Sequence, residues 1–307
     1  MFLIKKIFSV SLSLMMLIYM NLAGAEPGKE KYSMSDFNVE TVTVSSQGRK
    51  ISAMVVSRKD KKENSTGILW IHGGGYLTGM KEMFFMSRAA ELVMDYGAVV
   101  ISPDYTLSVQ APYPAAAEDC YNTLLYFKQN AQDFGINDSQ LMVGGESAGG
   151  GLCAAVCMMA RDRGEVNVAF QMPLYPMLDN TDTDSSRDNH GKVWNTALNH
   201  LAWRLYLKDD ALSADVSAYA APARQTDYSN LPPAYTFVGN GEPFFCETVQ
   251  YIENLKKAGV EAEIDIYESD VHAFDMLTPW KQTSKDAIKE FRSHFEYAQK
   301  NYFAAQK

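Results

Sequence analysis

The sequence predicts an α/β fold in which a mostly parallel sheet is covered by helices on both faces. Short continuous apolar runs, the clearest at 67–71 and 98–102, alternate with longer segments of helical periodicity. A serine framed by glycines also stands where one apolar run meets the next helix-like segment. The 307 residues suffice for one large domain with a sizeable core.

The predicted elements follow one another in an order that suits this fold. Two alternating segments joined across Gln47 and Gly48 predict an antiparallel hairpin, and the later alternation of strands with helices predicts parallel pairing. The expected strands span 39–45, 50–57, 67–71, 98–102, 140–143, 168–172, 233–238 and 262–266. The expected helices span 81–95, a segment beginning at Pro114, 152–160, 246–258 and 284–302.

The first 25 residues have the features of an export signal. A basic start precedes an apolar stretch over 7–20, and residues 23–25 form a small-x-small cleavage site. We therefore expect a mature chain over 26–307, periplasmic or secreted, without a stable membrane anchor. The alternative is an uncleaved N-terminal anchor, which also places the folded part outside the cytoplasm.

Charge and cysteine spacing argue against several kinds of partner. Lysine and arginine number 28 against 37 acidic residues, for a formal net charge of −9 without a basic cluster, which disfavours nucleic acid. No CxxC or HxxxH spacing occurs, so no metal site is expected. Cys153 and Cys157 lie one helical turn apart among apolar residues and are interpreted as buried thiols rather than a disulfide.

Ser147 is the candidate nucleophile. It stands at the centre of the G-x-S-x-G pentapeptide 145–149, between the predicted strand 140–143 and the predicted helix 152–160. The flanking glycines permit a sharp turn that lifts the hydroxyl out of the sheet, and the following helix N-terminus favours negative charge. A glycine-rich turn without chemistry is the alternative for this motif alone.

A nucleophilic serine needs a base and an orienting acid. Of the five histidines, His272 lies on the loop after the last predicted strand, and catalytic groups collect on such loops. Glu242 is the first carboxylate after the strand 233–238 and is the candidate acid. Glu247 begins the next helix and should point elsewhere, whereas Asp270 is expected to cap its own loop.

Consecutive glycines after the strand 67–71 predict an oxyanion hole. The backbone N–H groups of such a loop can face a tetrahedral oxyanion, together with the N–H of the residue after the nucleophile. A phosphate-cradling loop is the alternative, but no G-K-[ST] or G-x-G-x-x-G pattern follows.

Residues 179–226 interrupt the alternation of strands and helices. They are polar at first and then helical, which favours a cap over the active site, and an ordinary surface loop of this length is uncommon. Tyr76, Trp194 and Trp203 are candidates for the substrate pocket, with core packing as the alternative for each.

These motifs together resemble the hormone-sensitive-lipase-like branch of the α/β-hydrolases, also called the bacterial family IV esterases. The resemblance implies the α/β-hydrolase fold, with Gly74, Gly75 and Ala148 as oxyanion donors and a cap that favours short to medium acyl chains. It extends over about 40–300 and rests on the segments 72–76, 103–107, 114–116, 145–150, 175–179, 231–235 and 272–274.

Three positions depart from the usual pattern of that family. Glu146 precedes the serine where the family usually has aspartate, Glu242 stands at the usual aspartate of the acid position, and Cys246 replaces a second acidic residue. Because glutamate reaches one methylene further than aspartate, the loop that carries Glu242 must sit back slightly.

The function expected from these residues is that of an exported serine carboxylesterase acting on a small-molecule acyl ester. Ser147 would attack the ester carbonyl, His272 would take its proton, and Glu242 would stabilise the imidazolium. No metal or organic cofactor is implied. The alternatives are a serine peptidase or amidase of the same fold, which usually carries an additional large domain, and a non-catalytic binding protein, which typically lacks the serine or the histidine.

Overall fold

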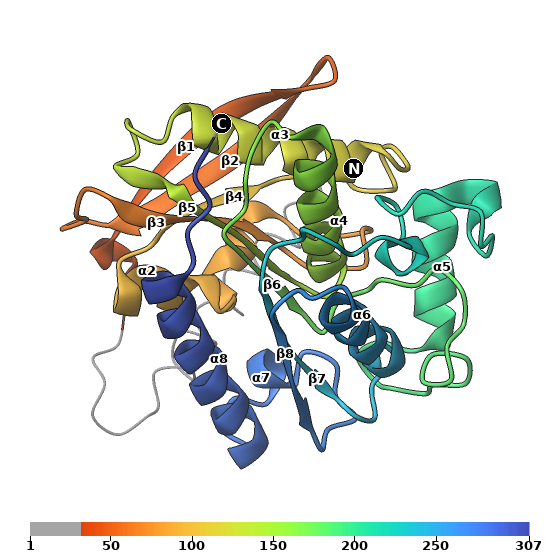
Figure 1. Ribbon diagram of the computed structural model, residues 1–307. Helices are drawn as coiled ribbons and strands as arrows, with labels where there is room; N and C mark the ends of the chain where they lie inside the picture. Colours follow the sequence, from red (N-terminus) through yellow and green to blue (C-terminus); the bar gives the residue numbers. More distant parts are fainter. Residues whose placement is uncertain (1–31, 307) are drawn as a thin grey trace, which may run out of the picture.

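The computed structural model describes residues 32–306, and the predicted signal segment 1–25 lies outside them. In this part of the chain, eight strands form one sheet in the order β1-β2-β4-β3-β5-β6-β7-β8, with helices on both faces (Figure 1). The strands are β1 (Phe37–Ser46), β2 (Arg49–Arg58), β3 (Ser65–Ile71), β4 (Val99–Pro103), β5 (Ile136–Glu146), β6 (Phe170–Leu174), β7 (Ala234–Gly239) and β8 (Ala262–Tyr267).

The helices lie mostly between the strands in sequence. The α-helices are α2 (Ala89–Tyr96), α3 (Ala115–Gln129), α4 (Ala148–Arg163), α5 (Thr196–Leu207), α6 (Phe245–Lys257), α7 (Phe274–Leu277) and α8 (Gln282–Asn301), and the 3-10 helices are η1 (Met34–Asp36), η2 (Lys81–Met86), η3 (Lys208–Asp210) and η4 (Pro222–Arg224).

Strand direction follows the prediction. β1 and β2 form an antiparallel hairpin, and β2 also pairs antiparallel with β4. Every pair from β4 across to β8 is parallel. The predicted α/β fold with an antiparallel start is therefore confirmed.

The central strand β3 shows why its sequence is apolar throughout. Leu69 and Ile71 pack into the core on the side of α3 and α4, whereas Ile68 and Trp70 pack into the core on the side of α2 and α8. Alternate side chains thus enter two different cores. Each such buried side chain contributes about 1.5–3 kcal/mol to folding, so the position of this strand is strongly fixed.

The predicted helix at 81–95 is two separate pieces, η2 and α2. The Ser87 hydroxyl between them donates to the carbonyl of Phe84 (2.8 Å) and accepts from the N–H of Ala89 (3.1 Å). A serine that bonds the local backbone in this way competes with a continuous helix. Strand β6 also starts two residues later than the predicted segment 168–172.

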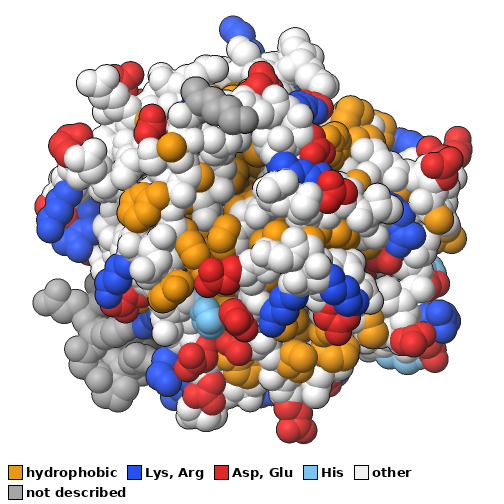
Figure 2. Space-filling model, in the orientation of Figure 1, with side chains coloured by type: hydrophobic (Ala, Val, Ile, Leu, Met, Phe, Trp, Pro, Cys, Tyr) orange, Lys and Arg blue, Asp and Glu red, His pale blue; other side chains and the backbone are white. Residues whose placement is uncertain are grey.

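The surface of the described residues gives two further observations. On the face drawn in Figure 2, acidic and basic side chains are interspersed, and lysines and arginines do not gather in one area. Between residues 32 and 306, every helix is too short or too polar to cross a bilayer.

Candidate active site

Ser147 occupies the turn between β5 and α4 in a strained backbone conformation. Its φ of 58° and ψ of −121° lie outside the regions that residues other than glycine usually adopt. The turn is held by its own main chain, since the Ser147 N–H donates to the carbonyl of Leu174 (3.0 Å) and its carbonyl accepts from Met177 (3.0 Å). Such strain persists only where the surroundings enforce it.

The turn approaches β3 so closely that it excludes a side chain at Gly149. A methyl group placed on Gly149 would lie 2.0 Å from the carbonyl oxygen of Ile71. The second glycine of the pentapeptide therefore lets the start of α4 pack directly on the end of β3. This contact places the serine beside the loop that follows β3.

The structure brings Ser147, His272 and Glu242 together from the loops after β5, β8 and β7. The Nε2 atom of His272 lies 2.9 Å from the Ser147 Oγ, and its Nδ1 atom contacts the Glu242 carboxylate. The other oxygen of that carboxylate accepts the N–H of Gly239 at 3.3 Å. Glu242 is fully buried, so its carboxyl group is held by these protein contacts rather than by water.

Aromatic rings enclose the imidazole of His272. Tyr175 and Phe244 meet it edge to face, with ring centroids 5.2 and 5.1 Å away, and Trp194 lies at 6.5 Å. These contacts restrict the orientation of the ring, which a base that must face both a hydroxyl and a carboxylate requires.

The glycine loop after β3 lies against the serine. A methyl group on Gly73 would be 3.2 Å from the Cβ of Ser147. Gly74 has a φ of +112°, a conformation that favours glycine. Among residues 32–306, no acceptor takes a hydrogen bond from the N–H groups of Gly74, Gly75 or Ala148. Three unused donors thus lie on the two segments that meet at Ser147.

His72 braces this loop from inside the protein. Its ring stacks on Tyr105 with centroids 4.2 Å apart, and its Nδ1 lies 2.8 Å from the carbonyl oxygen of Gly73. Burial lowers the pKa of His72 to about 4, so the ring is neutral at pH 7 and its Nδ1–H donates to that carbonyl.

The three candidate pocket residues lie at different depths. Tyr76 and Trp203 are almost fully buried, and the Tyr76 ring stacks on Tyr206 with centroids 4.0 Å apart. Trp194 is partly exposed, and a methyl group on Gly75 would lie 2.2 Å from its ring. Trp194 therefore covers the glycine loop, whereas the other two contribute to the core next to it.

The other acidic candidates are placed away from the imidazole. Glu247 accepts hydrogen bonds from the N–H groups of Leu178 (2.6 Å) and Asp179 (3.2 Å), so it holds the start of the segment after β6. Asp270 is exposed on its loop. Cys246, at the family's second acidic position, donates its N–H to the Ser185 hydroxyl (3.0 Å).

Sequence reasoning missed a group of buried polar residues beneath the site. Glu146 was noted as a departure from the family, but its neighbours Arg88 and Asp275 were not identified. Asp275 and Arg88 stand in no recognisable motif, whereas Glu146 and Tyr175 belong to segments that the resemblance had marked, 145–150 and 175–179.

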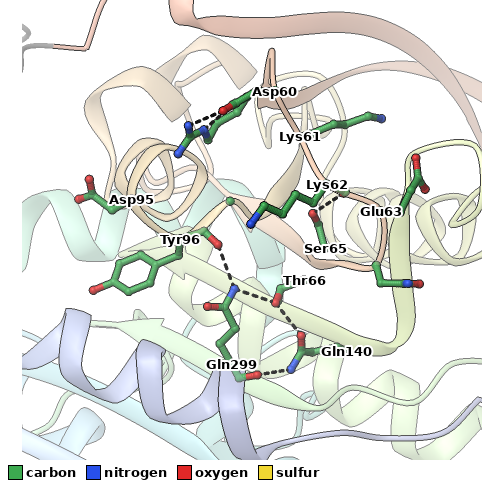
Figure 3. Close-up of a pocket in the computed structure, with 13 residues that line it drawn as sticks. Asp60, Lys61, Lys62, Glu63, Ser65, Thr66, Asp95, Tyr96, Gln140 and Gln299 are labelled. Atoms are coloured by element: carbon green, nitrogen blue, oxygen red, sulfur yellow. Dashed lines mark hydrogen bonds and ion pairs between the residues drawn. The ribbon is translucent and has the colours of Figure 1, made fainter.

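A separate polar cavity of about 550 Å³ lies at the amino-terminal ends of β3 and β5 (Figure 3). Since β3 has seven residues, it is roughly 20 Å from the glycine loop. Three polar residues in it bond to one another. The Thr66 hydroxyl donates to the Gln140 side chain (2.7 Å), Gln140 donates to the backbone carbonyl of Gln299 (2.6 Å), and the Gln299 side chain donates to the Thr66 hydroxyl (3.1 Å). At this end of the sheet, these three polar residues therefore have hydrogen-bond partners within the protein.

Comparison with known proteins identifies the fold family of the chain. Residues 68–276 match a family model described as alpha/beta hydrolase fold. Esterase LipI of Mycobacterium tuberculosis is 28% identical over 67% of this chain and 65% of its own length, so the chain spans about two thirds of that relative.

Two solved structures share most of the architecture. One is a bacterial heroin esterase, 31% identical with a TM-score of 0.80, covering 89% of this chain and 87% of the other. The second is a hyperthermophilic esterase from the archaeon Pyrobaculum calidifontis, 30% identical with a TM-score of 0.79, covering 94% and 92%.

Proposed function

The chain belongs to the alpha/beta hydrolase fold family, and on that premise we propose that it is a serine carboxylesterase acting on small acyl esters. One observation carries the proposal: the Ser147 hydroxyl, the His272 imidazole and the Glu242 carboxylate form a continuous chain of contacts beside three unused backbone donors. The named esterases among its relatives and structural neighbours support the same reaction class.

In the proposed reaction, Ser147 attacks the ester carbonyl while His272 takes the hydroxyl proton at Nε2. Glu242 holds the imidazole through Nδ1 and stabilises its charged form. The N–H groups of Gly74, Gly75 and Ala148 stabilise the oxyanion of the tetrahedral intermediate. His272 then protonates the leaving alcohol, and a water that it activates releases the acyl group from Ser147.

The substrate range proposed here is short to medium acyl chains. Trp194 covers Gly75, so its ring limits the space next to the carbonyl carbon of a bound ester. The segment 179–226, which contains α5 and two 3-10 turns, acts as the cap.

Residues 1–25 direct export and are cleaved. N-terminal sequencing of the mature protein would test this step, with Glu26 expected as the first residue.

The test is a series of p-nitrophenyl esters from C2 to C16, assayed on the mature protein beside Ser147→Ala. We expect activity that peaks at short chains and is absent from the variant, which keeps its unfolding midpoint. Hydrolysis by Ser147→Ala would refute the assignment of the nucleophile. An intact wild-type fold that cleaves an aminoacyl anilide and no ester would favour the peptidase alternative.

A further inference from the structure

A cluster of buried ionisable side chains lies beneath the proposed active site and contacts both of its main loops. Glu146 directly precedes Ser147, and Asp275 follows His272 by three residues. Both carboxyl groups are almost fully buried, and each interacts electrostatically with the other or with Arg88. Asp275 and Arg88 form an ion pair at 3.3 Å.

Tyr175 joins this cluster to the imidazole. Its ring meets the His272 ring edge to face at 5.2 Å, while its buried hydroxyl interacts with Asp275 and Glu146. Burial raises the pKa of Tyr175 well above its usual value, so the hydroxyl stays neutral. One side chain thus contacts both the proposed base and the charges beneath it.

The cluster contains more carboxyl groups than cations. Arg88 pairs with Glu91 (2.6 Å) and Asp275, and Arg292 pairs with Glu91 (2.9 Å) and Asp95 (3.4 Å). Two guanidinium groups therefore serve four carboxyl groups, counting Glu146. Glu91 and Asp95 are partly exposed, whereas Glu146 and Asp275 are buried and share the charge of Arg88. Because an unpaired carboxylate is costly in a buried site, one proton is expected to stay on this buried pair.

The hydrogen bonds indicate which carboxyl group keeps that proton. Asp275 has the guanidinium of Arg88 as its partner, whereas Glu146 receives only the neutral Nε1–H of Trp70 at 2.9 Å. The remaining oxygen of Glu146 is buried and bonds to no other described residue. Burial and then the charge of Asp275 raise the pKa of Glu146 to about 8, against the opposing effects of the Trp70 hydrogen bond and the charge of Arg88. Burial raises the pKa of Asp275 too, but there the charge of Arg88 is the main opposing effect.

We propose that Glu146 is a positioning residue that works in its neutral, protonated form. The neutral acid lets the turn that carries Ser147 and the loop that carries His272 pack on one shared cluster, at the separation that their 2.9 Å contact requires. The effect on catalysis rests on the proposed esterase function, whereas the protonation state of Glu146 does not.

The proposal fixes the sign of two pH effects. Because Glu146 holds its proton more tightly in the folded than in the unfolded chain, its contribution to stability falls as pH rises from about 4.5 to about 8. The turnover rate should decline when the proton leaves, since a new negative charge would face Asp275 beneath both loops.

The experiment compares Glu146→Gln and Glu146→Ala with the wild type, with Glu63→Gln as the matched control. Glu63 is an exposed carboxylate at the opposite end of the sheet, beside the cavity in Figure 3. The readouts are kcat and KM for p-nitrophenyl acetate, and the thermal unfolding midpoint, each from about pH 5 to pH 10.

We expect Glu146→Gln, which mimics the neutral acid, to stay within about threefold of the wild-type kcat near pH 6.5 and to exceed it at alkaline pH. The unfolding midpoint of Glu146→Gln, relative to that of the wild type, should increase as pH rises towards 8. Glu146→Ala should lose about tenfold or more in kcat with little change in KM. Glu63→Gln should follow the wild type in both profiles.

Two results would overturn the proposal. A loss in Glu146→Gln as large as in Glu146→Ala near pH 6.5 would mean that the charged form is required. A difference in unfolding midpoint between Glu146→Gln and the wild type that does not change with pH would mean that Glu146 does not keep its proton. The wild type could also lack esterase activity while the difference in unfolding midpoint between Glu146→Gln and the wild type still grows with pH. That result would refute the proposed function and support a protonated Glu146.

Discussion

The two ends of the central sheet use the same strands in opposite ways. At the carboxyl end, Ser147 and Ala273 adopt positive φ angles, and Glu146 and Asp275 are buried ionisable groups. At the amino end, Thr66, Gln140 and Gln299 of the cavity in Figure 3 form a closed set of hydrogen bonds. Buried carboxyl groups and unused backbone donors therefore lie where the proposed chemistry takes place.

This contrast shows what the sheet provides. Strands buried on both faces supply stability at either end, so the carboxyl end tolerates costs that an isolated loop would not. If the contrast is functional, changes at the carboxyl end should lower activity more than stability, and changes at the amino end should do the reverse.

The largest effect is expected from Glu242→Gln. The amide keeps the size of the side chain but removes the charge that faces the Nδ1 of His272, so kcat should fall by about 10³–10⁴. Steady-state kinetics on p-nitrophenyl acetate measure the loss, and circular dichroism controls for folding. Activity near the wild-type level would show that another group orients the imidazole.

The next effect is expected from Gly75→Ala. Its methyl group would meet the Trp194 ring and displace one oxyanion donor, so kcat should fall by about 10²–10³. Gly97→Ala is the matched control, because Gly97 has a similar φ of +70° but open space around it, at the amino end. Equal losses of activity in the two variants would remove the special role of the glycine loop.

A smaller effect is expected from the pH dependence of stability at His72. Its pKa is about 4 in the folded protein, below the value of about 6.5 when unfolded, so the unfolded chain binds more protons between these values. Stability should therefore fall by up to about 3 kcal/mol as pH drops from 6.5 to 4. Urea unfolding of the wild type and His72→Asn at pH 7 and pH 4 would show this, with a shallower decline in the variant; parallel declines would contradict it.

The smallest effect on activity is expected at the amino end. Gln299→Ala removes donors to the Thr66 hydroxyl (3.1 Å) and the Tyr96 carbonyl (3.2 Å), so stability should fall by about 1–2 kcal/mol. Its kcat should stay within about twofold of the wild type. The exposed Gln250→Ala serves as the control. A large loss of activity in Gln299→Ala would blur the distinction between the two ends.

The sequence could predict those parts of the candidate site that lie in recognisable motifs. Apolar runs such as 67–71 predict strands because both faces are buried, and the glycines next to Ser147 reflect contacts that exclude any side chain. The roles of Ser147, His272 and Glu242 stay predictions, although the fold places them together.

The remainder depends on contacts between distant parts of the chain. Arg88 and Asp275 are far apart in sequence, and neither lies in a recognisable pattern, so their ion pair beneath Ser147 depends on the folded arrangement of the chain and not on a local signal. The break in the predicted helix at Ser87 could not be predicted either. The sequence shows a serine at this position but does not show whether its hydroxyl bonds the local backbone or points to solvent.

The segment between β6 and β7 has a consequence for how such proteins diversify. It carries Trp194 and α5 but none of the three residues Ser147, Glu242 and His272. The proposed catalytic residues and the proposed cap are thus encoded in separate stretches of the gene, although Tyr175 at the start of this segment contacts His272. Recombination that exchanges only this stretch between relatives would transfer a preference for acyl length in one step, and chimeras whose preference follows the exchanged segment would demonstrate it.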